Sequence, residues 1–198
     1  MQAYLAGLGT TLSLILAVGP QNAFVLRQGL LRRHVFATCA FCALSDALLI
    51  GAGVLGAGAI ASRAPWFLDV MRWGGAAFLA AYGARAMRAA WRGGASMPQG
   101  AEAPGLGPTV AILAALTWLN PHVWLDTVVL IGSVAAGFGD RAGFALGAMS
   151  GSLLFFFALG YGARLLAPVF SRPAAWRVLD LGVGVVMWAL ACSLVLGR

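Results

Sequence analysis

The sequence predicts an all-α, polytopic membrane protein with six transmembrane helices, and three observations lead to this prediction. The 198 residues are 61% hydrophobic and only 10% charged, whereas soluble chains carry about 25% charged residues. The mean hydropathy is +0.89, so the bilayer is the natural solvent for the excess apolar surface. The apolar residues also gather in runs of about 20 or more, the length that a helix needs to cross a bilayer.

The candidate transmembrane helices follow one another with short connections. They cover roughly residues 3–27, 35–61, 66–91, 108–134, 142–167 and 176–197. No cleavable signal pattern precedes the first run, so we expect the amino-terminal segment to form part of the first helix. One connection is long and polar, and it divides the chain into a first three-helix repeat, a loop and a second three-helix repeat, at residues 1–92, 93–107 and 108–198.

The two halves share short motifs in the same order. Residues 16–20 resemble 117–121, 43–49 resemble 148–154, and 72–74 resemble 180–182. Because each half holds an odd number of helices, the second copy would be inverted in the membrane. Inverted repeats with helices broken at matching positions are typical of secondary transporters.

The basic residues predict the orientation. All 13 are arginines, and they lie at the ends of the apolar runs, which favours membrane loops over a nucleic-acid surface. One face would hold Arg27, Arg32, Arg33, Arg85, Arg88, Arg92, Arg172 and Arg177, and the other Arg63, Arg141 and Arg198. The positive-inside rule makes the first face cytoplasmic and places both termini outside.

Three charged residues lie within the apolar runs. Asp46 is flanked by apolar residues in the second helix, Arg72 lies about two turns into the third, and Asp126 follows Pro121 in the fourth. A carboxylate in hydrocarbon is costly, so each should face the bundle interior with a partner. We expect Asp46 and Arg72 to form an ion pair, either purely structural or a gate that a cationic substrate opens. Asp126 has no basic residue nearby in sequence, which leaves cation binding or hydrogen bonds to Thr and Trp donors.

Prolines break the first and fourth helices at matching positions. Pro20 and Pro121 each remove a backbone donor and clash with the preceding turn, so each would start a new half-helix. The free N–H groups of such a start attract a carboxylate. Gln21, Asn22, Asn120 and His122 lie at the breaks and add polar groups, so we predict a substrate site formed by these residues, the two prolines and the two aspartates. The competing interpretation of each proline is a packing kink.

Other patterns do not predict chemistry. Cys39 and Cys42 lie in an apolar helix, where packing of small residues explains their spacing better than a disulfide or redox site. Glycines at 51, 53 and 56 and at 143, 147 and 151 indicate close helix packing, which permits a homodimer as well as packing within one chain. The remaining acids are interpreted as loop or boundary charges: Asp69, Glu102, Asp140 and Asp180. We find no nucleophile–base pair, phosphate loop or metal cluster, so we expect no enzyme, no cofactor and no metal.

These motifs resemble a known family. Residues 19–30, Gly-Pro-Gln-Asn-Ala-Phe-Val-Leu-Arg-Gln-Gly-Leu, look like the first-helix signature of the LysE/ArgO family of basic amino-acid exporters. Residues 45–50 and 117–127 are similar to that family's second and fourth helix motifs, and the likeness covers essentially the whole chain. The resemblance implies export of L-arginine, L-lysine or both across a bacterial inner membrane, driven by a proton gradient or the membrane potential. The loop at 93–107 is short and poorly charged and says nothing about regulation.

The resulting hypothesis is alternating access around a central site. The substrate carboxylate would meet the half-helix starts, and its cationic groups would meet Asp46 and Asp126. Moving one positive charge outward against 100 mV costs about 2.3 kcal/mol, so counter-movement of a proton is expected. The alternatives are a small-cation or metal efflux protein, an intramembrane enzyme acting on lipid, and a non-transporting structural subunit.

Overall fold

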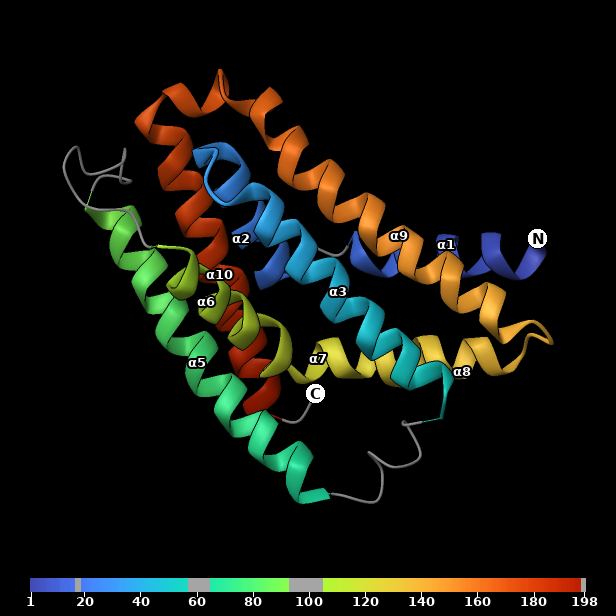
Figure 1. The fold of residues 1–198 in the computed structure, drawn as a ribbon. Helices are drawn as coiled ribbons and strands as arrows, with labels where there is room; N and C mark the ends of the chain where they lie inside the picture. The colour runs from blue at the N-terminus through green and yellow to red at the C-terminus, as the bar shows by residue number, and fades with distance from the viewer. Residues whose placement is uncertain (17–18, 57–64, 93–104, 197–198) are drawn as a thin grey trace.

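The computed structural model describes residues 1–16, 19–56, 65–92 and 105–196, and within these ranges every regular element is a helix (Figure 1). The first half holds α1 (Gln2–Ile15), α2 (Pro20–Leu31), α3 (Val35–Val54) and α5 (Pro65–Trp91). The second half holds α6 (Leu106–Trp118), α7 (Pro121–Trp124), the π-helical segment η1 (Leu125–Leu130), α8 (Ile131–Ala136), α9 (Arg141–Gly162), the 3₁₀ turns η2 (Ala163–Leu166) and η3 (Val169–Ser171), and α10 (Pro173–Leu196).

Apolar helices of membrane-spanning length make up most of the fold. Among the described residues, α3, α9 continued by η2, and α10 are each long and apolar enough to cross a bilayer, and two bent pairs bring the number to five. The sixth predicted span corresponds to α5, whose 27 residues include Arg72, Arg85 and Arg88. The chain is therefore a multi-pass membrane protein, and the six-span count and inverted relation of the halves stay predictions.

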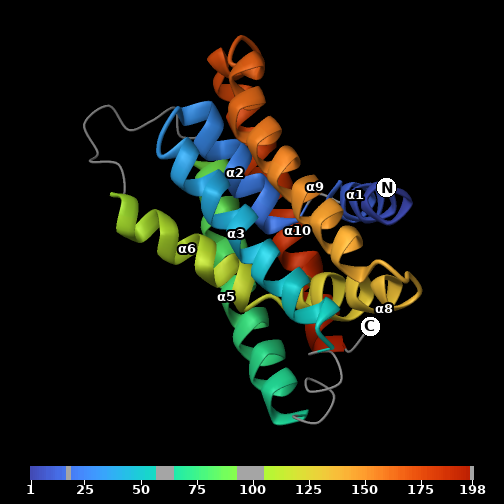
Figure 2. The ribbon, with the colours of Figure 1, turned by 45° about the vertical axis from the view of Figure 1, so that its right-hand side comes forward.

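The two bent pairs are the helices predicted to be broken. The axes of α1 and α2 differ by 84°, and those of α6 and the segment from Pro121 to Ala136 by 61°. In both views α1 and α8 extend from the bundle to the same side, and neither α2 nor α6 extends to that side (Figures 1 and 2). Each break thus places a helix start in the middle of the fold, at Pro20 and at Pro121.

Helices at matching positions of the two halves pack against each other. α3 packs on α9, and α5 packs on α10, while α1 lies along α9. Glycine allows the closest approaches: a Cβ at Gly147 of α9 would collide with the backbone of Tyr4, and one at Gly53 of α3 would lie 2.5 Å from the carbonyl oxygen of Val128. The expectation of close helix packing is confirmed for Gly53 and Gly147, but it was wrong for Gly56, where an added Cβ would meet nothing within 4 Å.

The arginine-rich ends of several helices lie together. α2 and α5 end there, α9 and η2 end there, and α10 begins there (Figures 1 and 2). α2 runs from the centre of the fold toward this end, and α10 runs from this end back past the centre. α2 and α10 are therefore antiparallel and in contact between the centre of the fold and the arginine-rich end.

Candidate substrate site at the helix breaks

A cavity of about 390 Å³ lies where the two breaks meet. Its volume falls within the roughly 300–1,000 Å³ that is usual for small-molecule sites. The lining comes from α1, α2, α3, α9, α10 and the segment that starts at α7. Seven of the eight residues predicted for the substrate site lie on its wall: Pro20, Gln21, Asn22, Asp46, Asn120, His122 and Asp126. Pro121 is not part of the lining.

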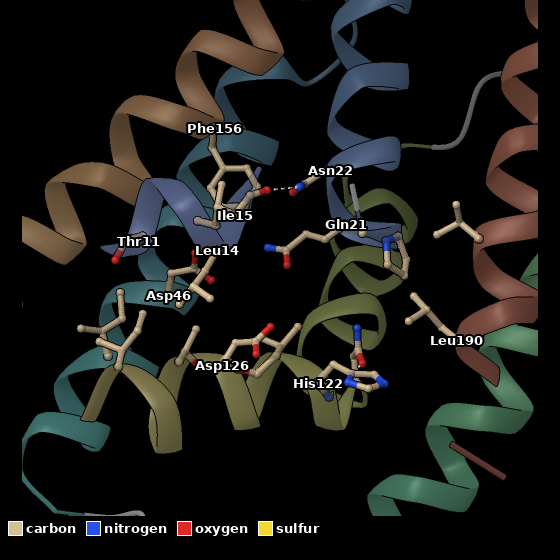
Figure 3. Close-up of a pocket in the computed structure, with 18 of the residues that line it drawn as sticks. Thr11, Leu14, Ile15, Gln21, Asn22, Asp46, His122, Asp126, Phe156 and Leu190 are labelled. Atoms are coloured by element: carbon tan, nitrogen blue, oxygen red, sulfur yellow. Dashed lines mark hydrogen bonds between the residues drawn. The ribbon is translucent and has the colours of Figure 1, made fainter. Parts of the chain in front are cut away.

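The start of α2 is open toward this cavity. Pro20 occupies the first turn, where its missing N–H is no loss, and the N-cap residue is Gly19, which has no side chain to cap the helix. The side chain of Gln21 is only 7% exposed; its Nε2 makes no hydrogen bond of normal geometry, and the thiol of Cys42 on α3 lies close to the amide. Figure 3 shows this amide reaching into the cavity toward Asp46 and Asp126. A buried donor without a partner is costly, which suits a group that awaits a ligand.

The second break is closed by its own side chains. Asn120 Oδ1 accepts a hydrogen bond from the backbone N–H of His122 at 3.1 Å, so the start of α7 is already capped. The predicted carboxylate contact at this second start is therefore not supported, because the donor that it needs is occupied. His122 faces the cavity, and its Nε2 lies 3.3 Å from Ser193 Oγ of α10.

Each break is braced by a side chain from the far half of the helix. Asn22 Nδ2 donates to the carbonyl of Ile15 at 2.8 Å across the first break, drawn as the dashed line in Figure 3. Trp124 Nε1 donates to the carbonyl of Trp118 at 3.1 Å across the second. Carbonyls in the last turn of a helix lack partners within it, so these bonds satisfy them and hold the bends. Asn22 was predicted as a substrate ligand; its Nδ2 makes this structural bond, and its role in substrate binding stays a prediction.

Asp46 lies on the α3 wall of the cavity and is 3% exposed. It accepts a hydrogen bond of 2.7 Å from Ser152 Oγ of α9, a residue that is fully buried. The neighbouring Ser45 Oγ accepts from Trp118 Nε1 at 3.2 Å. One hydroxyl leaves most of the acceptor capacity of a carboxylate unused.

Asp126 lies on the opposite wall, in the π-helical segment η1. Single π-helical turns inside α-helices occur frequently at functional sites. Its side chain is exposed to the cavity (Figure 3). His122 is four residues earlier, so the two side chains share one helix face.

The predicted ion pair between Asp46 and Arg72 is not formed. Arg72 instead donates to the carbonyls of Leu194 (2.5 Å) and Val195 (2.8 Å) at the end of α10. The prediction assumed that helices adjacent in sequence are adjacent in space. α5 packs on α10, and α3 packs on α9, so Arg72 and Asp46 belong to different helix pairs.

The interpretation of Asp180 as a boundary charge was wrong. Asp180 is 1% exposed, and its Oδ1 accepts a 2.8 Å bond from Arg27 Nη1 of α2. This is the only ion pair within the described ranges. Within those ranges neither Asp46 nor Asp126 forms an ion pair with an arginine, and His122 is the basic side chain near Asp126.

Sequence reasoning missed several residues of the cavity wall. Thr11 of α1 is 1% exposed and its hydroxyl has no partner, and Phe156 and Leu190 supply apolar surface. Ser152 was missed as the partner of Asp46, although a serine inside an apolar run was a usable signal. The cysteines at 39 and 42 are buried free thiols, and the described residues hold no cluster of three or more potential metal ligands.

Comparison with known proteins identifies the family to which the chain belongs. The family model described as LysE type translocator matches residues 12–198. Among curated relatives, the arginine exporter protein ArgO of Yersinia enterocolitica is 44% identical over 197 residues, covering 98% of this chain and 96% of the relative. Proteins of the same name from Salmonella schwarzengrund and Salmonella paratyphi A are 42% and 41% identical, each covering 96% of this chain and 92% of the relative. No solved structure matches the chain. The chain belongs to the LysE type translocator family.

Proposed function

We propose that this protein exports basic amino acids, L-arginine and/or L-lysine, across the bacterial inner membrane. The proposed mechanism is alternating access through the cavity at the helix breaks. The observation that carries the proposal is the pair of acids on the cavity wall. Asp46 and Asp126 come from different helices and face one space (Figure 3), and neither is paired with an arginine in the described part of the chain; His122 is the basic side chain near Asp126. Carboxylates within a membrane protein that lack an arginine partner attract cations, and a basic amino acid brings two. The relatives named as arginine exporters favour the same substrate class.

The remaining charge of the substrate is its carboxylate. The start of α2 is the partner for it, because its N-cap has no side chain and the unpartnered Nε2 of Gln21 lies beside it. Helix starts favour anions. The substrate would therefore lie with its carboxylate at α2 and its two cationic groups toward Asp46 and Asp126.

The polarity of the cavity fits a zwitterion with an aliphatic stem. Ile50, Phe156 and Leu190 lie between the polar groups of the wall and would contact the methylene groups of arginine or lysine. A neutral amino acid has no second cation, so it would form one charge-assisted hydrogen bond fewer with the two acids. The site thus favours cationic side chains through the interaction that only they can make.

Orientation and energy coupling complete the proposal. The arginine-rich end would face the cytoplasm, so export carries the substrate from that end to the other. Since outward movement of one positive charge costs about 2.3 kcal/mol per 100 mV, a proton moving inward is the expected counter-ion.

The test is flux of labelled L-arginine and L-lysine in proteoliposomes. Saturable arginine flux above that of empty liposomes is expected, and an imposed potential should change its rate, with labelled L-leucine as the neutral control. Absence of arginine and lysine flux, or equal flux of leucine, would contradict the proposed function.

A further inference from the structure

The partner of the substrate carboxylate and one of the two cavity acids are neighbours. The amide of Gln21, in the first turn of α2, lies close to the thiol of Cys42 on α3, and the same thiol lies close to the carboxylate of Asp46. Cys42 is four residues before Asp46, so the two side chains share one face of α3. Figure 3 shows Gln21 and Asp46 reaching into the same cavity. The structure therefore brings an anion site and an acid together.

The chemistry of an amino acid requires such a combination. Its carboxylate and its α-ammonium are bonded to the same carbon atom, so the groups that bind them must be adjacent. The start of α2 favours the anion, and Asp46 is the acid that shares a neighbour with Gln21. The α-ammonium would then lie at Asp46, and the side-chain cation, at the other end of an aliphatic stem, would lie at Asp126.

The hydrogen bond that Asp46 already makes fits a compact cation. Its Oδ2 accepts the 2.7 Å bond from Ser152 Oγ, and the side chain is 3% exposed. A guanidinium binds a carboxylate best through two parallel hydrogen bonds, whereas an ammonium is a compact point charge. A buried carboxylate with only one oxygen wholly free therefore suits the ammonium better than the guanidinium.

Asp126 offers what a guanidinium needs. It lies on the opposite wall and is exposed to the cavity, and neither of its oxygens accepts a hydrogen bond from the described residues. Both oxygens are thus free for a planar fork. His122, the basic side chain near Asp126, has its Nε2 3.3 Å from Ser193 Oγ and leaves the carboxylate open.

We infer that Asp46 binds the α-ammonium of the transported amino acid and that Asp126 binds its side-chain guanidinium. This inference rests on the proposed function, because it assumes that a basic amino acid occupies the cavity. Gln21 and Asp46 then recognise the part that all amino acids share, and Asp126 is the residue that distinguishes a basic side chain from a neutral one. Asp126 also favours arginine over lysine, because an ammonium has no planar fork for the two parallel bonds.

Two analogues of arginine separate these roles. L-Citrulline keeps the α-ammonium and replaces the guanidinium by an uncharged urea group of similar shape, whereas δ-guanidinovalerate keeps the guanidinium and lacks the α-ammonium. The experiment measures the constants with which these two compounds and unlabelled L-arginine inhibit the flux of labelled L-arginine in proteoliposomes. Both analogues should bind the unmodified protein more weakly than arginine does.

Asp126→Asn should raise the inhibition constant of arginine roughly tenfold or more, because a charge-assisted hydrogen bond is lost. The constant of citrulline should hardly change, so the preference for arginine over citrulline disappears. Asp46→Asn should instead remove the preference for arginine over δ-guanidinovalerate and retain the preference over citrulline. Asp140→Asn is the matched control, because Asp140 is the exposed N-cap of α9 and its side chain bonds only the N–H of Gly143; it should leave all three constants unchanged.

The reverse pattern, in which Asp46→Asn removes the preference over citrulline, overturns the inference. An Asp126→Asn protein that keeps the full preference over citrulline, or that binds all three compounds equally more weakly, also overturns it. Because Asp126 is exposed, its asparagine variant tests the assignment even if Asp46→Asn does not fold. If the unmodified protein moves no arginine, the proposed function itself fails, so the two failures are distinguishable.

Discussion

Replacing Asp46 by asparagine isolates the charge of this side chain from its shape. The amide oxygen of asparagine can still accept the 2.7 Å bond from Ser152, so the contact between α3 and α9 is retained. The substitution removes only the negative charge, at a position that is 3% exposed. An uncharged amide costs less to bury than a carboxylate, so the melting temperature should stay the same or rise.

The effect on transport should be large. A hydrogen bond to a charged group contributes about 1.5–3 kcal/mol, and each 1.4 kcal/mol is a factor of ten in an equilibrium constant. Asp46→Asn should therefore raise the KM for arginine roughly ten- to 150-fold in proteoliposome flux, with Asp140→Asn as the control for loss of one acid. An Asp46→Asn protein that is folded and transports arginine with an unchanged KM would refute the assignment of Asp46 to the substrate cation.

Three further predictions test the rest of the site and its frame. Gln21→Leu should raise the KM for arginine about tenfold or more, because a donor to the substrate carboxylate is lost. The inhibition constant of agmatine, which lacks the carboxylate, should stay the same. An equal weakening of arginine transport and of agmatine inhibition would contradict a contact between Gln21 and the carboxylate. Gly53→Ala should destabilise the fold by about 1–3 kcal/mol through collision with the backbone of Val128, whereas Gly9→Ala, which meets open space, should not; equal melting temperatures would contradict the close packing. Asn22→Ala should lower the free energy of unfolding by about 1 kcal/mol, because it removes the hydrogen bond to Ile15 across the first break. Thermal melting measures this, and an unchanged melting temperature would show that the bond does not stabilise the bend.

The fold could be predicted closely because the physics of single helices is local. Runs of apolar residues set the bounds of α3, α9 and α10, and the prolines at 20 and 121 set the breaks. The cavity residues were also predictable, because polar groups in apolar helices have few explanations, and Asp46, Asp126 and Gln21 all turned out to line one space.

Pairings between distant helices could not be predicted in the same way. The expected partner of Asp46 was Arg72, chosen because their helices are neighbours in sequence, and the structure gives Asp46 a serine from α9 instead. Asp180 was interpreted as a loop or boundary charge. Its partner Arg27 is 153 residues away in the chain, and nothing local signals such a contact.

The two breaks also differ in a way that their similar motifs conceal. Both have a proline at the helix start, but the preceding residue is Gly19 in one and Asn120 in the other. Of these two residues, only Asn120 has a side chain that can cap the helix. One start is therefore open to a ligand and the other is closed, which converts a symmetric prediction into an asymmetric site.

Equilibrium binding of labelled L-arginine to the purified protein tests whether arginine binds in the cavity between Asp46 and Asp126. Saturable binding is expected for the unmodified protein and for Asp140→Asn, whose exposed carboxylate only caps α9, and no measurable binding for a folded Asp46→Asn/Asp126→Asn double variant. Undiminished binding by the double variant would mean that the cation is held elsewhere and that these two acids do not bind it.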